Sequence, residues 1–88
     1  MKVTVRYFAG ARAAAGVEEE TIDLEGSSPR PVPPTLATLS AVLSERHGSA
    51  LTRVLAACSF LLDEVAGSRE RPLYDGARVD VLPPFAGG

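Results

Sequence analysis

Two segments of alternating apolar and polar residues, one near each end of the chain, constrain its fold most. In residues 2–7 the side chains of Val3, Val5 and Tyr7 fall on one face and their polar neighbours on the other, and residues 78–82 alternate in the same way. A period of two residues is typical of a half-buried β-strand. Because both segments are rich in Val, we expect them to form the buried centre of a sheet.

Phe8 continues the first alternating segment but falls on its polar face. An aromatic ring on that face is either covered by a neighbouring loop of the chain or left to contact a partner. The sequence leaves both interpretations open and makes Phe8 a candidate partner-binding residue.

The clearest helical pattern lies between these strands and begins after Thr35, a residue type suited to the N-cap position. Its apolar residues follow the spacing of one helix face: Leu36, Leu39, Val42 and Leu43. Gly48 ends the run just after His47, the chain's single histidine. His47 suits the negative end of the helix dipole, and because no second base or ligand accompanies it, the pattern predicts no catalytic role.

The remaining segments predict short elements. The alanines of residues 10–16 favour a short helical turn, and residues 21–24 predict a second strand that pairs with the first. The acidic run Glu18–Glu20 is expected to be a solvated edge that resists aggregation. Later come a proline-rich surface loop at 26–34, a helical turn near 51–55, a buried strand at 58–62, a turn at 63–64, a short strand at 65–66, a polar loop at 67–71 and a tight Asp-Gly turn at 72–76.

This order of elements predicts an α+β fold, in which one main helix covers one face of a mixed sheet of four or five strands. It is the arrangement of the β-grasp, or ubiquitin-like, fold. We expect residues 1–82 to form this domain and residues 83–88 to form a flexible C-terminal tail.

Size, charge and cysteine content narrow the function. A domain of 88 residues has little room for an enclosed active site, which disfavours an enzyme that acts alone. A net charge of -2 lacks the basic surplus for binding nucleic acid, and no apolar run is long enough to span a membrane. The N-terminus predicts no secretion signal, so the chain is expected to be cytoplasmic. Its single cysteine, Cys58, is expected to be buried and agrees with a reducing compartment. Cys58 has no companion ligands, so no metal or cofactor is predicted to bind.

The last predicted strand runs directly into the sequence Pro83-Pro84-Phe85-Ala86-Gly87-Gly88. Two consecutive prolines end strand pairing and favour an extended path, so these residues are expected to project as an arm. Two terminal glycines leave the final carboxylate without a neighbouring side chain, which lets it pass through a narrow channel. By themselves, however, the glycines favour a frayed terminus.

This ending, together with residues 75–82 and with Tyr7-Phe8-Ala9 at the close of the first strand, resembles the small, sulfur-carrying subunit of molybdopterin synthase. The resemblance extends over nearly the whole chain and is most specific at the tail, whereas the ubiquitin-like sulfur carriers as a group share only the two glycines. Residues 27–34 depart from the family as a longer loop, and residues 63–71 as a more polar segment. Neither departure lies in the tail.

The resemblance implies a chemistry for Gly88. An activating enzyme would use ATP to adenylate its carboxylate, and a persulfide from a sulfur donor would displace AMP to leave a thiocarboxylate. That sulfur would pass to cyclic pyranopterin monophosphate within the large, catalytic synthase subunit. The tail residues that would enter the channel of that subunit are Pro83, Pro84, Phe85, Ala86 and Gly87. Phe8 and Phe85 would contact the large subunit, and the chain itself would bind no cofactor.

Other functions fit the same residues. The acceptor of the sulfur could belong to thiazole, cysteine or tRNA thiolation, although Phe85 after two prolines favours the molybdopterin branch. The chain could also be a β-grasp interaction module with an inert tail, or a modifier joined to target lysines. Activation by ATP separates carriers and modifiers from the inert module, and the fate of the activated carboxylate separates carrier from modifier.

Overall fold

The computed structural model describes residues 1–24 and 33–84. Its strands are β1 (Lys2–Tyr7), β2 (Glu19–Asp23), β3 (Ser59–Leu62), β4 (Val65–Ala66) and β5 (Arg78–Leu82). Its helices are α1 (Ala9–Ala15), α2 (Leu36–His47) and α3 (Ser49–Ala57). Most of the predicted proline-rich loop at 26–34 lies outside the described residues.

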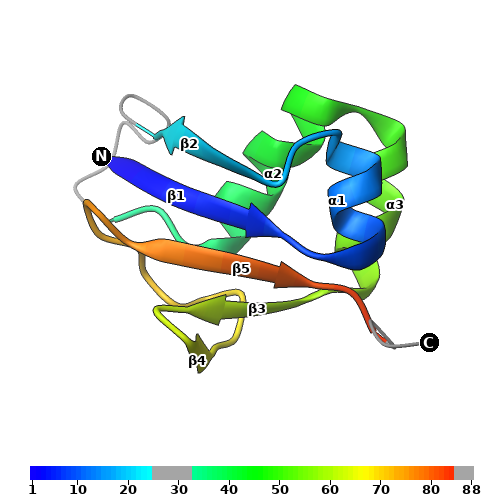
Figure 1. Cartoon of the computed structure of the whole chain (residues 1–88). Helices are drawn as coiled ribbons and strands as arrows, with labels where there is room; N and C mark the ends of the chain where they lie inside the picture. Colours follow the sequence, from blue (N-terminus) through cyan, green and yellow to red (C-terminus); the bar gives the residue numbers. More distant parts are fainter. Residues whose placement is uncertain (25–32, 85–88) are drawn as a thin grey trace.

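The five strands form one mixed sheet in the order β2-β1-β5-β3-β4 (Figure 1). β1 runs parallel to β5 and antiparallel to β2, whereas β3 runs antiparallel to both β5 and β4. The first and last strands are therefore neighbours inside the sheet, in the central position that their valine content predicts. Their inward side chains are fully buried: Val3, Val5, Val79 and Val81.

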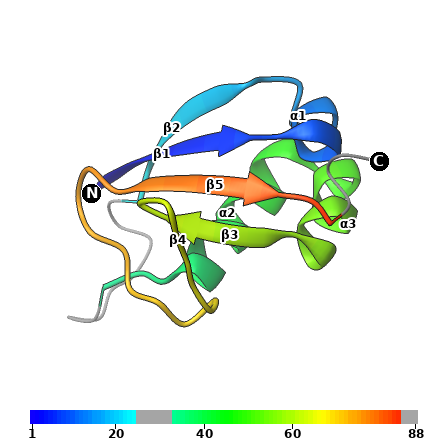
Figure 2. The same ribbon diagram turned by 60° about the horizontal axis from the view of Figure 1, so that its bottom comes forward.

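In Figure 1, α2 and α3 lie behind the sheet and α1 lies beyond the end of β1, so the face of the sheet toward the viewer is open. Figure 2 shows β5 between β1 and β3, with the end of β5 directed toward α1 and α3. Leucines from two helices fill the space between the layers: Leu36, Leu39 and Leu43 of α2, and Leu51 and Leu55 of α3. The burial of these side chains joins the helices to the sheet.

Thr35 caps α2 as predicted. Its Oγ1 accepts the backbone N–H of Thr38, and the Oγ1 of Thr38 accepts the backbone N–H of Thr35. This reciprocal capping box satisfies two donors that the helix itself leaves unpaired. Gly48 ends α2 at a φ of 85°, a left-handed conformation that glycine adopts without strain.

The second helical segment is longer than the sequence predicts. Instead of one turn near 51–55, α3 spans Ser49–Ala57, and its Leu51 and Leu55 are buried against the core. α2, with 12 residues, remains the main helix, and tertiary packing stabilises the residues on both sides of the recognisable turn in α3. The predicted turns at 63–64 and 72–76 are confirmed by positive φ values at Asp63, Glu64 and Gly76.

Candidate functional site

The edge of the sheet where β1 and β5 end brings Phe8 and the base of the tail together. Since these strands are parallel neighbours, both reach their carboxyl ends at this edge. Phe8 follows β1 directly, and its backbone N–H donates to the carbonyl oxygen of Val81 at 3.2 Å. Pro83 and Pro84 follow β5 and belong to no strand. The predicted tail therefore begins beside Phe8.

The tail residues on which the proposed chemistry depends, Phe85, Ala86, Gly87 and Gly88, lie outside the described residues. Their roles stay predictions. Of the predicted tail, the structure describes Pro83, which is half-buried, and Pro84, which is exposed.

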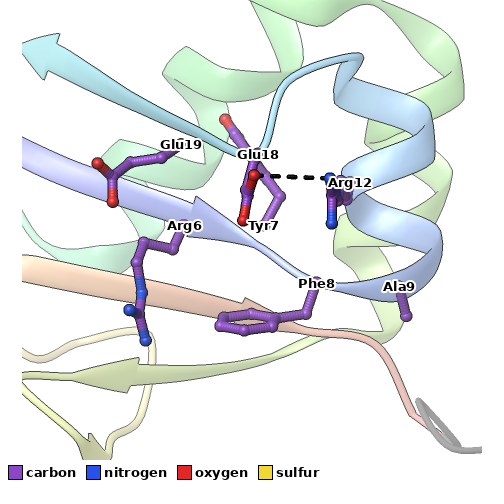
Figure 3. A pocket seen from close by; sticks show the side chains of 7 residues that line it. All are labelled: Arg6, Tyr7, Phe8, Ala9, Arg12, Glu18 and Glu19. Carbon is purple, nitrogen blue, oxygen red and sulfur yellow. Dashed lines mark ion pairs between the residues drawn. The ribbon is translucent and has the colours of Figure 1, made fainter.

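The ring of Phe8 lies on the open face of the sheet. Phe8 keeps extended backbone angles (φ −123°, ψ 149°), so the alternation of β1 continues through it and its side chain points away from the core. Figure 3 shows the ring over β5, beside Arg6, whose guanidinium carbon is 5.3 Å from the ring centre. Phe8 is half-buried, and the guanidinium of Arg6 on β1 packs against its ring.

Two leucines extend the apolar surface around Phe8. Leu82 on β5 and Leu61 on β3 have the parity that faces away from the core, and both are half-buried. We call Phe8, Leu61 and Leu82 the open-face patch. The two leucines were not among the predicted contact residues, although the parity that identifies Phe8 applies to them as well.

A hollow of about 510 Å³ opens beside Phe8 (Figure 3). The charged side chains of Arg6, Arg12, Glu18 and Glu19 contribute to its lining. Arg12 Nη2 and Glu18 Oε2 form an ion pair at 3.5 Å, and both side chains are more than half exposed. Two arginines and two glutamates give this lining no surplus of positive charge for an anion.

Arg6 and Asp80 form an ion pair across the open face, between β1 and β5. Arg6 Nε donates to Asp80 Oδ1 at 2.9 Å, and Arg6 Nη2 donates to Asp80 Oδ2 at 3.4 Å. Asp80 is 7 % exposed and is the one buried charged residue in the part of the chain that the structure describes. The hydrogen bond to Asp80, and then the charge of its carboxylate, raise the pKa of the Arg6 guanidinium.

The expectation that the acidic run forms a solvated edge is wrong for Glu20. Glu20 shares the parity of the buried Ile22, and its side chain is only 12 % exposed. Its Oε2 accepts the Tyr7 hydroxyl at 2.6 Å and lies 2.5 Å from Nε2 of His47. Its Oε1 accepts Nε of Arg46 at 2.8 Å. His47 therefore has a partner that its sequence neighbours did not reveal.

This Glu20 cluster links β1, β2 and the last turn of α2. Burial by itself would raise the pKa of the Glu20 carboxyl, but the hydrogen bonds from Tyr7, His47 and Arg46 together outweigh it and hold that pKa below its ordinary value. Burial, followed by the hydrogen bond to Glu20, raises the pKa of the Tyr7 hydroxyl. Because each group already has a partner, the cluster serves as a structural connection between the layers.

Cys58 is buried, as predicted, and its thiol donates to the carbonyl oxygen of Val54 at 3.1 Å. Burial raises the pKa of this thiol, which disfavours the reactive thiolate. Within residues 1–24 and 33–84, no group of three or more His, Cys, Asp or Glu side chains is arranged so that it could hold a metal ion. None of the helices in those ranges has the length and apolarity needed to cross a membrane.

The mixed five-stranded sheet, with helices over one face and a chain end leaving its central strand, defines a ubiquitin-like β-grasp protein. The structure is similar to that of a putative molybdopterin converting factor, subunit 1, from Pyrococcus furiosus, with a TM-score of 0.79 and 28% identity over 97% of this chain and 99% of that one. A complex of subunits 1 and 2 of the molybdopterin-converting factor from Helicobacter pylori matches with a TM-score of 0.67 and 28% identity, covering 100% of both chains. The predicted fold class is confirmed.

The chain belongs to the ThiS family, whose model matches residues 5–88. It is also 33% identical, over 90 residues and 100% of both chains, to the molybdopterin synthase sulfur carrier subunit of Chlamydomonas reinhardtii. The family resemblance identified from the tail and from Tyr7-Phe8-Ala9 is thereby confirmed.

Proposed function

We propose that this chain is a sulfur carrier in molybdenum cofactor biosynthesis and that Gly88 holds the sulfur as a terminal thiocarboxylate. The observation that carries the proposal is the similarity to a molybdopterin synthase sulfur carrier subunit, at 33% identity over the full length of both chains. The family match extends through the last residue, so it includes the Gly-Gly ending.

A free carboxylate is a poor acyl donor, so the Gly88 carboxylate first needs a leaving group. Its oxygen attacks the α-phosphorus of ATP in an activating enzyme, and pyrophosphate leaves. The terminal sulfur of a persulfide donor then attacks the acyl carbon, and AMP leaves. A thiol reduces the resulting acyl disulfide, which releases the thiocarboxylate. Because the sulfur stays attached to the chain, docking of the domain delivers it at a high effective concentration.

The partner that receives the loaded tail is the large synthase subunit. The Helicobacter pylori structure that contains subunits 1 and 2 of its molybdopterin-converting factor supports this partner. The open-face patch supports it too, because Phe8 and Leu82 lie beside Pro83, where the tail begins. A protein that encloses the tail would cover this patch, and the Phe8 ring buried there would act as a binding hot spot.

The test is a reconstitution with purified chain, activating enzyme, ATP and a sulfur donor, followed by intact-mass spectrometry. We expect one carboxylate oxygen to be replaced by sulfur in the wild-type chain. A chain that lacks Gly88 should keep its melting temperature, because a terminal residue contributes little to the core, but should fail to transfer sulfur. Pterin thiolation by the shortened chain would show that the terminal-carboxylate mechanism is wrong.

The identity of the sulfur acceptor is tested by mixing the thiocarboxylated chain with the large subunit and cyclic pyranopterin monophosphate. Formation of the pterin dithiolene supports the proposal. Sulfur transfer to a thiazole, cysteine or tRNA substrate in its place, or an isopeptide bond to a lysine, would overturn the assignment to molybdenum cofactor biosynthesis.

A further inference from the structure

We propose that Arg6, held by Asp80, is a specificity-determining residue for the partner that docks on the open face. It requires that partner to place a neutral acceptor, a carbonyl oxygen, against the outer edge of the guanidinium. The inference rests on the proposed function, because the partner is taken to be the large subunit.

The Arg6–Asp80 pair lies at a boundary on the open face. In the sheet register Asp80 stands opposite Arg6 on β1 and opposite Leu61 on β3. Toward the tail the face is apolar, with Phe8 and Leu82. On the other side Asp80 lines a small hollow together with the charged side chains of Asp63, Glu64 and Arg78. A partner that covers the apolar half therefore meets the pair at its margin.

Asp80 does not use all the N–H donors of the Arg6 guanidinium. An arginine side chain carries five N–H donors, and Asp80 engages only Nε and one N–H of Nη2. The Arg6 side chain is 35% exposed, and its guanidinium carbon lies 5.3 Å from the centre of the Phe8 ring. A partner that buries this ring must therefore also desolvate the outer donors of Arg6.

Donors that lose water without gaining an acceptor weaken binding. A partner with a purely apolar surface at this position is thus disfavoured, whereas one with an oxygen at the right place is accepted. Arg6 would therefore give specificity by weakening the binding of partners that lack this oxygen. Because the Arg6 guanidinium is held in place by Asp80, the position of that oxygen is specified as well.

The charges around Arg6 favour a neutral oxygen. Asp80 already balances the guanidinium, and Glu19 lies opposite Arg6 on β2. The carboxylate of Glu19 also contributes to the raised pKa of Arg6. A third carboxylate, supplied by the partner, would be repelled by these two, whereas a main-chain or amide carbonyl would not.

The test exchanges the two residues in the full chain, as the double variant R6D/D80R, and measures both melting temperature and affinity for the large subunit. The exchange can re-form the ion pair but moves the guanidinium by one strand, roughly 4.8 Å. We expect a folded chain whose affinity falls about tenfold or more, the scale of one lost hydrogen bond to a charged group. If the pair is only structural, the exchanged chain binds as the wild type does.

A second variant, Arg6→Lys, decides the matter if the exchanged chain does not fold. It keeps the charge beside Asp80 but loses the planar fork, so we expect a similar melting temperature and a similar loss of affinity. Arg53→Lys, on the exposed surface of α3, is the matched control and should bind normally. Normal binding by Arg6→Lys overturns the proposal.

Salt dependence tests the neutral acceptor. We expect the Arg6 variants to lose the same affinity at low and at high ionic strength. A loss that shrinks at high salt would indicate that the partner's acceptor is a carboxylate, and would overturn the claim that it is a neutral oxygen. The thiocarboxylate reconstitution separates the two proposals. Suppose that the wild-type chain is loaded with sulfur and binds the large subunit, but that the Arg6 variants bind just as tightly. That result refutes the inference about Arg6 and leaves the proposed function standing.

Discussion

Replacing Glu20 with Ala tests whether the Glu20 cluster holds the sheet against α2. The substitution removes the acceptor for Tyr7, His47 and Arg46 at once. It also leaves the Tyr7 hydroxyl without a partner in a residue that is only 2% exposed. We therefore expect a large loss of folding stability from this single substitution on the edge strand β2.

The magnitude follows from the exposure of each partner. A hydrogen bond to a charged group contributes about 1.5–3 kcal/mol, and the Tyr7 bond belongs at the middle of that range because Tyr7 is buried. The His47 contact adds about 1 kcal/mol, whereas the Arg46 side chain is more than half exposed and its bond adds little. We expect a loss of about 3 kcal/mol, which in a domain of this size lowers the melting temperature by roughly 12–24 °C.

The dependence on pH provides a second readout. Because the folded pKa of Glu20 lies below its ordinary value of 4.5, its contribution to stability is complete well above pH 4.5. The contribution is lost as the pH falls through the lower folded pKa. The difference in unfolding free energy between wild type and Glu20→Ala should therefore be largest at neutral pH and shrink in acid.

Glu19→Ala is the matched control, because Glu19 is the exposed neighbour of Glu20 on the same strand. It should change the unfolding free energy by no more than about 0.5 kcal/mol. Thermal and chemical unfolding of both variants from neutral to acid pH decides the question. Equal melting temperatures for the two variants, or a Glu20→Ala deficit that does not shrink in acid, would refute the reasoning.

Three further predictions concern the tail, docking and helix capping. Phe85→Ala should weaken binding to the large subunit about thirtyfold, or ~2 kcal/mol, at an unchanged melting temperature, and Phe8→Ala should weaken it with a small loss of stability because its ring packs beside Arg6. A large drop in stability at undiminished affinity would contradict both. Gly87→Leu should leave the fold intact and slow adenylation, because a bulky side chain would hinder entry of the tail into the site of the activating enzyme; a normal rate of pyrophosphate release would argue against that steric account. Thr35→Ala should cost about 1 kcal/mol in chemical unfolding, and no change would show that the capping box of α2 contributes nothing measurable.

Local sequence patterns predicted much of the fold and part of the site. Alternation identified β1 and β5, helical spacing with Thr35 and Gly48 identified α2, and parity alone placed Phe8 away from the core. These features depend on the geometry of a single segment, so neighbouring residues are enough to reveal them. The family resemblance likewise rests on short contiguous segments: the tail with residues 75–82 before it, and Tyr7-Phe8-Ala9.

Side-chain contacts between distant segments could not be predicted in this way. Glu20 looks like part of a solvated acidic run until the pairing of β1 with β2 and the position of α2 bring Tyr7 and His47 to it. Asp80 looks like an ordinary polar residue of an alternating strand until Arg6 covers it from the neighbouring strand, 74 positions away in the chain.

The sequence by itself therefore determined most of the elements, the direction in which Phe8 points and the residues available for chemistry in the tail. The tertiary structure decided which charges are buried, which leucines join Phe8 on the open face, and that this face meets the base of the tail. The physical reason is that burial and charge pairing depend on which strands become neighbours, and here the parallel pairing of β1 with β5 brings residues from opposite ends of the chain together.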